Sequence, residues 1–100
     1  MDEQSRTSID LASLTRIAEL AVEQVDGLEP DHAAVEVDAD GSLRVLLRVH
    51  GQWGVPLQPA AARVRREVVR VTAAMTGLRV ACVDVEVVGL VVVAPAPEPV

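Results

Sequence analysis

The sequence predicts a small α+β domain with the element order α-β-β-α-β, in which both helices pack on one face of a three-stranded sheet. Two segments, residues 11–25 and 61–75, repeat apolar residues at helical spacing, and Gly27 and Gly77 stand where these repeats stop. Three further segments alternate apolar and polar residues with a period of two, as half-buried strands do; they are residues 33–38, 43–50 and 78–90. One hundred residues, half of them hydrophobic, are enough for one domain with one core.

The first helix follows a polar leader, residues 1–9, which we expect to be flexible. Thr7 and Asp10 have the spacing of a capping box at its start. The apolar residues on one side of this helix are Leu11, Leu14, Ile17, Ala18, Ala21, Val22 and Val25. We expect the domain to span residues 10–90.

A β-hairpin is predicted next, after a connector at residues 29–32. A three-residue loop with Gly41 in the left-handed conformation places Val37 opposite Leu43. A two-residue turn would place Val37 opposite Arg44, so the three-residue loop is favoured. The predicted inward residues of the two strands are Val35, Val37, Leu43, Val45, Leu47 and Val49.

The second helix starts after a loop, residues 51–56, that holds the sole tryptophan, Trp53. Pro59 fits the first turn of this helix, where a missing N–H costs no hydrogen bond. The predicted buried stripe is Ala61, Val64, Val68, Val71 and Met75, and the neighbouring stripe is Arg63, Arg66 and Arg70. Glu67 lies four residues from Arg63, at the spacing of an ion pair.

The third strand follows Gly77 directly. The residues predicted to face the core are Ala81, Val83, Val85 and Val87, and those predicted to face solvent are Cys82, Asp84 and Glu86. This strand pairs either with the first strand or with the second. We favour the first, which makes the first strand central and the third antiparallel to it. Residues 91–100 are rich in alternating prolines and predict an extended, disordered tail.

The composition argues against several classes of protein. The net charge of −6 disfavours nucleic-acid binding by bulk charge. A single cysteine excludes an internal disulfide and a cysteine-based zinc site. The N-terminus does not resemble a signal peptide, and no apolar run reaches the ~20 residues of a membrane span, so we expect a cytoplasmic protein. The absence of Lys, Asn, Phe and Tyr indicates a GC-rich bacterial genome, such as that of an actinobacterium.

Asp84 and Glu86 are the closest approach to a catalytic pair of carboxylates. They lie two residues apart on one strand face, as a general acid and base would. Arg44 and Arg48 fall on the same face and balance them, which is typical of a solvated sheet surface. We therefore interpret this face as structural.

The remaining reactive side chains show no catalytic or metal-binding pattern. Cys82 alternates with apolar neighbours and is interpreted as a partly buried thiol. His32 and His50 lie in different connectors with no metal-ligand spacing. We therefore predict no enzyme activity, no catalytic residues, no cofactor, no metal and no small-molecule substrate.

Two features are candidates for binding. The cluster Arg63, Arg65, Arg66 and Arg70 could hold phosphate or an acidic partner, although the wet side of an amphipathic helix is the favoured interpretation. Trp53 is a candidate anchor for a partner or a membrane surface. The alternative, in which Trp53 folds back to cap the core, is equally well supported by the sequence.

Three segments lie in order along the chain and together carry a resemblance. They are IAELAV (residues 17–22) leading to VDGL (25–28), then VHG (49–51), then MTGLRV (75–80) followed by VDVEVVGL (83–90). This set resembles the alkaline shock protein family, also called the envelope stress response family. The resemblance covers residues 13–90.

The resemblance implies a small, non-enzymatic α+β protein of the cytoplasm that serves cell-envelope homeostasis under alkaline or envelope stress. Some members of that family gather at the inner face of the membrane through a membrane-anchored partner. The expected partner is therefore another family member, a second copy of the chain or a membrane-anchored envelope protein, with only indirect membrane contact. The alternative function is a nucleic-acid-binding module that uses Arg63, Arg66 and Arg70.

Overall fold

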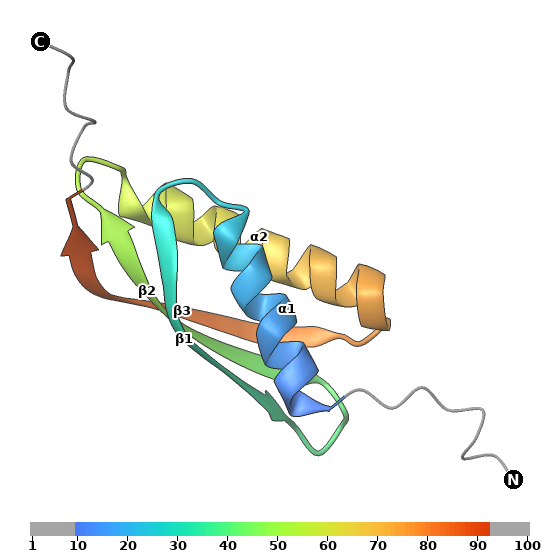
Figure 1. The fold of residues 1–100 in the computed structure, drawn as a ribbon. Coiled ribbons are helices and arrows are strands. Elements are labelled where there is room, and N and C mark those ends of the chain that lie inside the picture. The colour runs from blue at the N-terminus through green and yellow to red at the C-terminus, as the bar shows by residue number, and fades with distance from the viewer. Residues whose placement is uncertain (1–9, 93–100) are drawn as a thin grey trace, which may run out of the picture.

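The computed structural model describes residues 10–92, which form two helices and three strands (Figure 1). They are α1 (Leu11–Glu23), β1 (Leu28–Val37), β2 (Leu43–Gln52), α2 (Leu57–Thr76) and β3 (Val80–Val91). The predicted α+β class, the element order and the packing of the helices against the sheet are confirmed. The predicted leader and the prolines of the predicted tail lie outside the described residues.

The strand order is β1-β2-β3, so the central strand is β2. The favoured prediction, with the first strand central, is wrong. β3 runs parallel to β2, and α2 is the crossover that parallel neighbours require. Two features of the chain favour this order. The inward residues of β2 are all apolar and almost inaccessible, whereas β1 contains Pro30, whose missing N–H suits an edge strand.

β1 starts earlier than predicted. Residues 29–32 belong to the strand rather than to a connector, and they pair with the last residues of β2. A register shift between Pro30 and His32 leaves Asp31 as a bulge. The prediction missed this part of the strand because Glu, Pro and Asp are depleted in strands.

The hairpin turn has the predicted register. Val37 pairs with Leu43, and Gly41 has a φ of 87°. Ser42 closes the turn by donating to Asp40 Oδ1 from its backbone N–H (3.0 Å) and from its hydroxyl (2.6 Å). The hydroxyl hydrogen bond lowers the pKa of Asp40. Val37 was predicted to be buried but is exposed, because it lies at the end of an edge strand.

The start of α1 is fixed by Asp10, which is the N-cap residue. Its Oδ1 accepts a hydrogen bond from the Ser13 N–H at 2.8 Å, and this bond lowers the pKa of Asp10. The predicted box placed the cap at Thr7, which lies outside the described residues. At the other end the C-cap is Gln24, and Gly27 (φ 99°) lies in the turn that leads into β1.

α2 buries a stripe that differs from the predicted one in its last two turns. Val64, Val68 and Thr72 are buried, whereas Val71 is partly exposed and Met75 is 64% exposed. The buried residues follow one row of four-residue steps, a row along which helices commonly pack. The predicted stripe alternated three- and four-residue steps and so turned away from the core.

The join between α2 and β3 forms as predicted, with Gly77 as the left-handed C-cap (φ 72°). The Thr76 hydroxyl donates to the Thr72 carbonyl oxygen at 2.7 Å and accepts from the Leu78 N–H at 3.0 Å. The Gly77 N–H donates to the Ala73 carbonyl oxygen at 2.9 Å. These bonds satisfy backbone groups that a helix end otherwise leaves open.

β3 presents the predicted faces from Val83 onward. Val83, Val85 and Val87 pack against the core, but they are only partly buried because β3 is an edge strand. Ala81 was predicted to face the core and is exposed. A register irregularity at the start of the β2–β3 ladder changes the parity there, and Val80 contacts the core instead.

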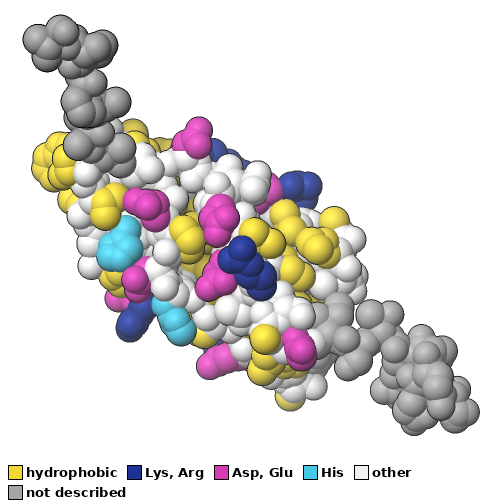
Figure 2. Space-filling model, viewed as in Figure 1, with side chains coloured by type: hydrophobic (Ala, Val, Ile, Leu, Met, Phe, Trp, Pro, Cys, Tyr) yellow, Lys and Arg dark blue, Asp and Glu magenta, His cyan; other side chains and the backbone are white. Residues whose placement is uncertain are grey.

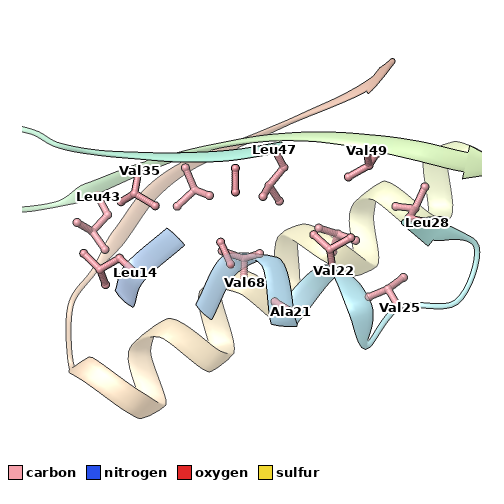
Figure 3. Close-up of a cluster of buried hydrophobic side chains, with 14 of the residues drawn as sticks. Leu14, Ala21, Val22, Val25, Leu28, Val35, Leu43, Leu47, Val49 and Val68 are labelled. Carbon is pink, nitrogen blue, oxygen red and sulfur yellow. The ribbon is translucent and has the colours of Figure 1, made fainter. Parts of the chain in front are cut away.

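The core is aliphatic and lies between the sheet and the two helices (Figure 3). The inner side chains of β2, among them Leu47 and Val49, point toward the helices that carry Val22 and Val68. α1 and α2 also contact each other, and both contribute small residues to the core, namely Ala18, Ala21 and Ala60.

The difference between the two stripes of α2 is testable by truncation. Val68→Ala removes buried methyl groups and should lower the free energy of unfolding by about 1–3 kcal/mol. Met75→Ala acts on an exposed side chain and should change it by less than about 0.5 kcal/mol. Urea denaturation followed by far-UV circular dichroism measures both. An equal loss in the two variants would contradict the stripe described above.

Gly27 is predicted to be irreplaceable for two separate reasons. Its φ of 99° strains any L-residue, and a Cβ there would collide with the Val55 side chain. Gly54 has a φ of 90° with open space around it, so Gly54→Ala is a matched control for strain alone. We expect Gly27→Ala to lose about 1–3 kcal/mol more stability than Gly54→Ala, from the overpacking. Indistinguishable urea midpoints for the two variants would show that Val55 does not pack on Gly27.

Candidate functional site

The turn that follows β2 is hydrogen-bonded to the chain segments that flank this central strand, one next to β1 and one at the end of β3. The Gln52 N–H donates to the Gly27 carbonyl oxygen at 2.9 Å, and the Trp53 N–H donates to the Val91 carbonyl oxygen at 2.8 Å. The Val55 N–H then donates to the Gln52 carbonyl oxygen at 3.1 Å. The backbone of this turn is therefore an ordered extension of the sheet.

Trp53 projects its side chain into solvent from this ordered turn. The side chain is 70% exposed. Val55, rather than Trp53, packs over Gly27. The two segments of the chain approach so closely there that a Cβ on Gly27 would collide with the Val55 side chain. The alternative in which Trp53 caps the core is therefore wrong, and Trp53 stays a candidate anchor for a partner.

Leu90 and Val92 extend the apolar surface at the end of the sheet that carries Trp53. They are 50% and 76% exposed, and Gly51 and Gln52 of β2 pair with Leu90 and Val91. Figure 2 shows hydrophobic side chains at the end of the molecule where β2 and β3 finish. We call Trp53, Leu90 and Val92 the end patch. Other large apolar side chains, such as Met75 and Val37, are also exposed, but the end patch is the one that contains the tryptophan. A group of exposed apolar side chains is a candidate docking site.

The end patch continues into the free edge of β3. Within residues 10–92, β3 has a strand neighbour on one side only. Its 12 residues, Val80–Val91, include no proline and no lysine, the residues that commonly protect an edge from pairing with another chain. The sheet therefore has an edge on which a further strand can be added.

The outer face of the sheet, which the helices leave uncovered, is charged. The sequence predicted that Arg44 and Arg48 balance the carboxylates of Asp84 and Glu86. Arg48 Nε and Glu86 Oε1 do form an ion pair at 3.3 Å. Arg44 and Asp84 are not opposite each other, because Arg44 lies opposite Cys82 and Asp84 lies opposite Leu46. Both members of the ion pair are well exposed, so the pair contributes little to stability.

The cysteine and the two histidines do not come together. Cys82 lies opposite Arg44, and its Sγ is 3.7 Å from Asp84 Oδ1. His50 is six residues from Arg44 along β2, which corresponds to roughly 20 Å along the sheet. His32 lies opposite Arg48, four residues from Arg44 or roughly 13 Å away. Among the described residues, Cys82 therefore has no histidine at the distance of a nucleophile and base.

One contact on the outer face was missed by the sequence analysis. The β1 bulge brings Asp31 Oδ1 to 3.1 Å from His50 Nε2. Gly89 lies on the other side of the imidazole, and a Cβ there would be 3.1 Å from His50 Nδ1. The two residues lie 19 positions apart in the sequence, and only the bulge after Pro30 joins them.

The arginines of α2 divide into two groups. Arg70 donates from Nε and Nη2 to the two carboxylate oxygens of Glu67, at 3.2 and 2.5 Å. These hydrogen bonds lower the pKa of Glu67 and raise that of Arg70. Glu67 was predicted to pair with Arg63, but it is engaged one turn further along. Arg63 and Arg66 line a hollow that also contains Asp26 and Glu67.

The described residues also bear on metal binding and membrane insertion. Residues 10–92 contain no group of three or more His, Cys, Asp or Glu side chains placed to hold a metal ion. None of the helices described is both long enough and apolar enough to cross a membrane.

Comparison of the chain with family models, curated proteins and solved structures finds no significant match. The α+β class is therefore established by the structure itself.

Trp53 is predicted to contribute almost nothing to folding. Because its side chain is 70% exposed and lies outside the core, Trp53→Ala should change the free energy of unfolding by less than about 0.5 kcal/mol. Urea denaturation monitored by far-UV circular dichroism measures this without using the indole as the probe. A loss of several kcal/mol, as for a buried aromatic residue, would mean that Trp53 closes the core.

Proposed function

We propose that this chain is a non-enzymatic protein-interaction module of the bacterial alkaline and envelope stress response. In this proposal it acts in the cytoplasm, where it self-associates or docks on a membrane-anchored partner. The end patch is the observation that carries the interaction. The resemblance of residues 13–90 to the alkaline shock protein family supports the biological setting.

Trp53 has the properties of an interface anchor. An indole covers about 150–250 Å² when it is buried, more than other side chains. Anchors of this kind dominate binding, and their truncation commonly costs at least about 2 kcal/mol. The hydrogen bonds at Gln52 and Trp53 hold the turn before any partner arrives, so little backbone entropy is lost on docking.

The charge around α2 favours a protein partner over the alternative nucleic-acid function. Arg70 is occupied by Glu67, and two carboxylates line the hollow beside Arg63 and Arg66. Those carboxylates repel a phosphate backbone, which needs a concentrated positive surface. Arg63 and Arg66 are better suited to a partner that carries charges of both signs.

The test is affinity capture from cells grown under alkaline or cell-wall stress, with photo-crosslinking to hold weak complexes. The wild-type chain should recover a second copy of itself or a membrane-anchored protein. Trp53→Ala should weaken that complex by at least about 2 kcal/mol, or about 30-fold in Kd.

Met75→Ala is the matched control, because Met75 is also a large exposed apolar residue. It lies at the C-terminal end of α2, whereas Trp53 precedes the N-terminal end of that helix. It should capture the same partner as the wild type. A wild-type chain that stays monomeric and recovers no membrane-associated protein would contradict the proposal. Equal capture by Trp53→Ala and wild type would also contradict it.

A further inference from the structure

We propose that residues 82–87 of β3 take up an extended segment of a different protein as a fourth strand of the sheet, and that this segment alternates apolar residues with arginine or lysine. In strand addition of this kind, main-chain hydrogen bonds supply the affinity and alternate side chains supply the specificity. That the added strand belongs to the cellular partner rests on the proposed function. The preference of the edge for such a strand does not.

The two edges of the sheet are not equally complete. On β1, the inward side chains of Ala33 and Val35 are 5% and 8% exposed, so they are covered although β1 is an edge strand. On β3, the inward valines from Val83 to Val87 pack against the same core but stay partly exposed. β1 also carries Pro30 and a bulge, both of which hinder pairing with a further strand. An added strand therefore has more apolar surface left to cover at β3 than at β1.

The regular part of β3 sets the length of the site. The ladder between β2 and β3 is interrupted at Ala81 and at Val88, and residues 82–87 pair with β2 without a break between these two points. Alternate residues of a strand direct their N–H and C=O groups to opposite sides, so this segment also presents backbone groups at its free edge. A partner segment of about six or seven residues matches this length.

The outward carboxylates of this segment define the charge of the partner. Asp84 and Glu86 are both exposed, and Glu86 forms its ion pair with Arg48 of the one strand that β3 already pairs with. Among residues 10–92, no ion pair engages Asp84. A strand with apolar residues inward and arginine or lysine outward repeats the pattern of β2 and places cations opposite both carboxylates.

The same carboxylates disfavour a second copy of β3 at this edge. A two-fold axis at the middle of the strand pairs each residue with one from the same segment of the second copy. An axis at Val85 sets Asp84 opposite Glu86, and an axis at Glu86 sets that carboxylate opposite its own copy. Like charges directly opposite each other destabilise a sheet. The edge therefore discriminates by charge between a copy of itself and a basic strand.

Three peptides test the site on the full chain. TVRVRVT carries the proposed pattern and reads the same in both directions, so its alternation fits a parallel or an antiparallel strand. TVEVEVT reverses the charge, and RRTVVVT keeps the composition without the alternation. Each is titrated to about 1 mM into isotope-labelled protein, and amide hydrogen exchange is measured by NMR. TVRVRVT should saturate and slow the exchange of alternate amides within residues 82–87, and the other two peptides should not.

Two double variants separate the local carboxylates from the bulk charge. Asp84→Asn/Glu86→Gln removes the proposed partners of the two arginines and should weaken TVRVRVT binding by about 3- to 10-fold. Glu36→Gln/Asp38→Asn removes the same number of charges near the end of β1 and is the matched control, with an unchanged Kd. Far-UV circular dichroism checks that both variants fold. The comparison of the three peptides on the wild-type chain does not depend on either variant.

Several outcomes would overturn the proposal. They are the absence of saturation by TVRVRVT, equal binding of RRTVVVT, and protection of amides on another element in place of residues 82–87. Equal weakening in the two double variants would also overturn it, because bulk charge would then be the cause. Protection of the same amides on raising the protein concentration, without peptide, would assign the edge to a second copy and overturn it as well.

The failure of this proposal can be distinguished from a failure of the proposed function. If TVRVRVT does not bind but Trp53→Ala still weakens partner capture, the interaction module stands and the strand site is removed. If TVRVRVT protects residues 82–87 but the chain captures no partner from cells, the preference of the edge stands and the interaction function is removed. If both hold, an excess of TVRVRVT should lower the capture of the partner, and an excess of RRTVVVT should not.

Discussion

The burial and pairing of β2 is the constraint on which the rest of the structure depends. Its inner residues from Leu43 to Val49 are buried beneath both helices, and its backbone is hydrogen-bonded to a strand on each side. A strand fixed in this way leaves little freedom at its end. The next residues, Gln52 and Trp53, continue the hydrogen bonding to Gly27 and Val91. The exposed position of the indole is thus a consequence of the packing of the central strand.

Local patterns in the sequence predict the elements of this fold but not all of their neighbours. The parity of the hairpin could be predicted because one alternative would place Val37 opposite Arg44. The strand order could not be predicted from periodicity, since the third strand alternates in the same way beside either neighbour. Pro30 was the available signal, because a residue without an N–H belongs at a sheet edge. The burial of Thr72 in place of Met75 depends on how α2 lies across the sheet, which no local pattern encodes.

The proposed binding surface was predicted in part. Trp53 was identified as a candidate from the sequence, but its exposure depends on Val55 filling the space over Gly27, a contact between residues 28 positions apart. Leu90 and Val92 were not identified, because the alternation of a strand does not show at which residue the helices stop covering it. The arginine stripe was identified, while the engagement of Arg70 by Glu67 became evident only in the structure. The end patch therefore combines a residue visible in the sequence with two that only the fold places beside it.

Amide hydrogen exchange at the end of β2 tests the central claim most directly. If the packing of β2 holds the turn rigid, the amides of Gln52 and Trp53 should exchange slowly, with protection close to that of Leu47 in the middle of the strand. The Gly54 amide, which has no acceptor among the described residues, should exchange fast and serves as the internal control. Exchange of the Trp53 amide as fast as that of Gly54 would mean that the indole sits on a loose loop, and would contradict a preformed binding surface.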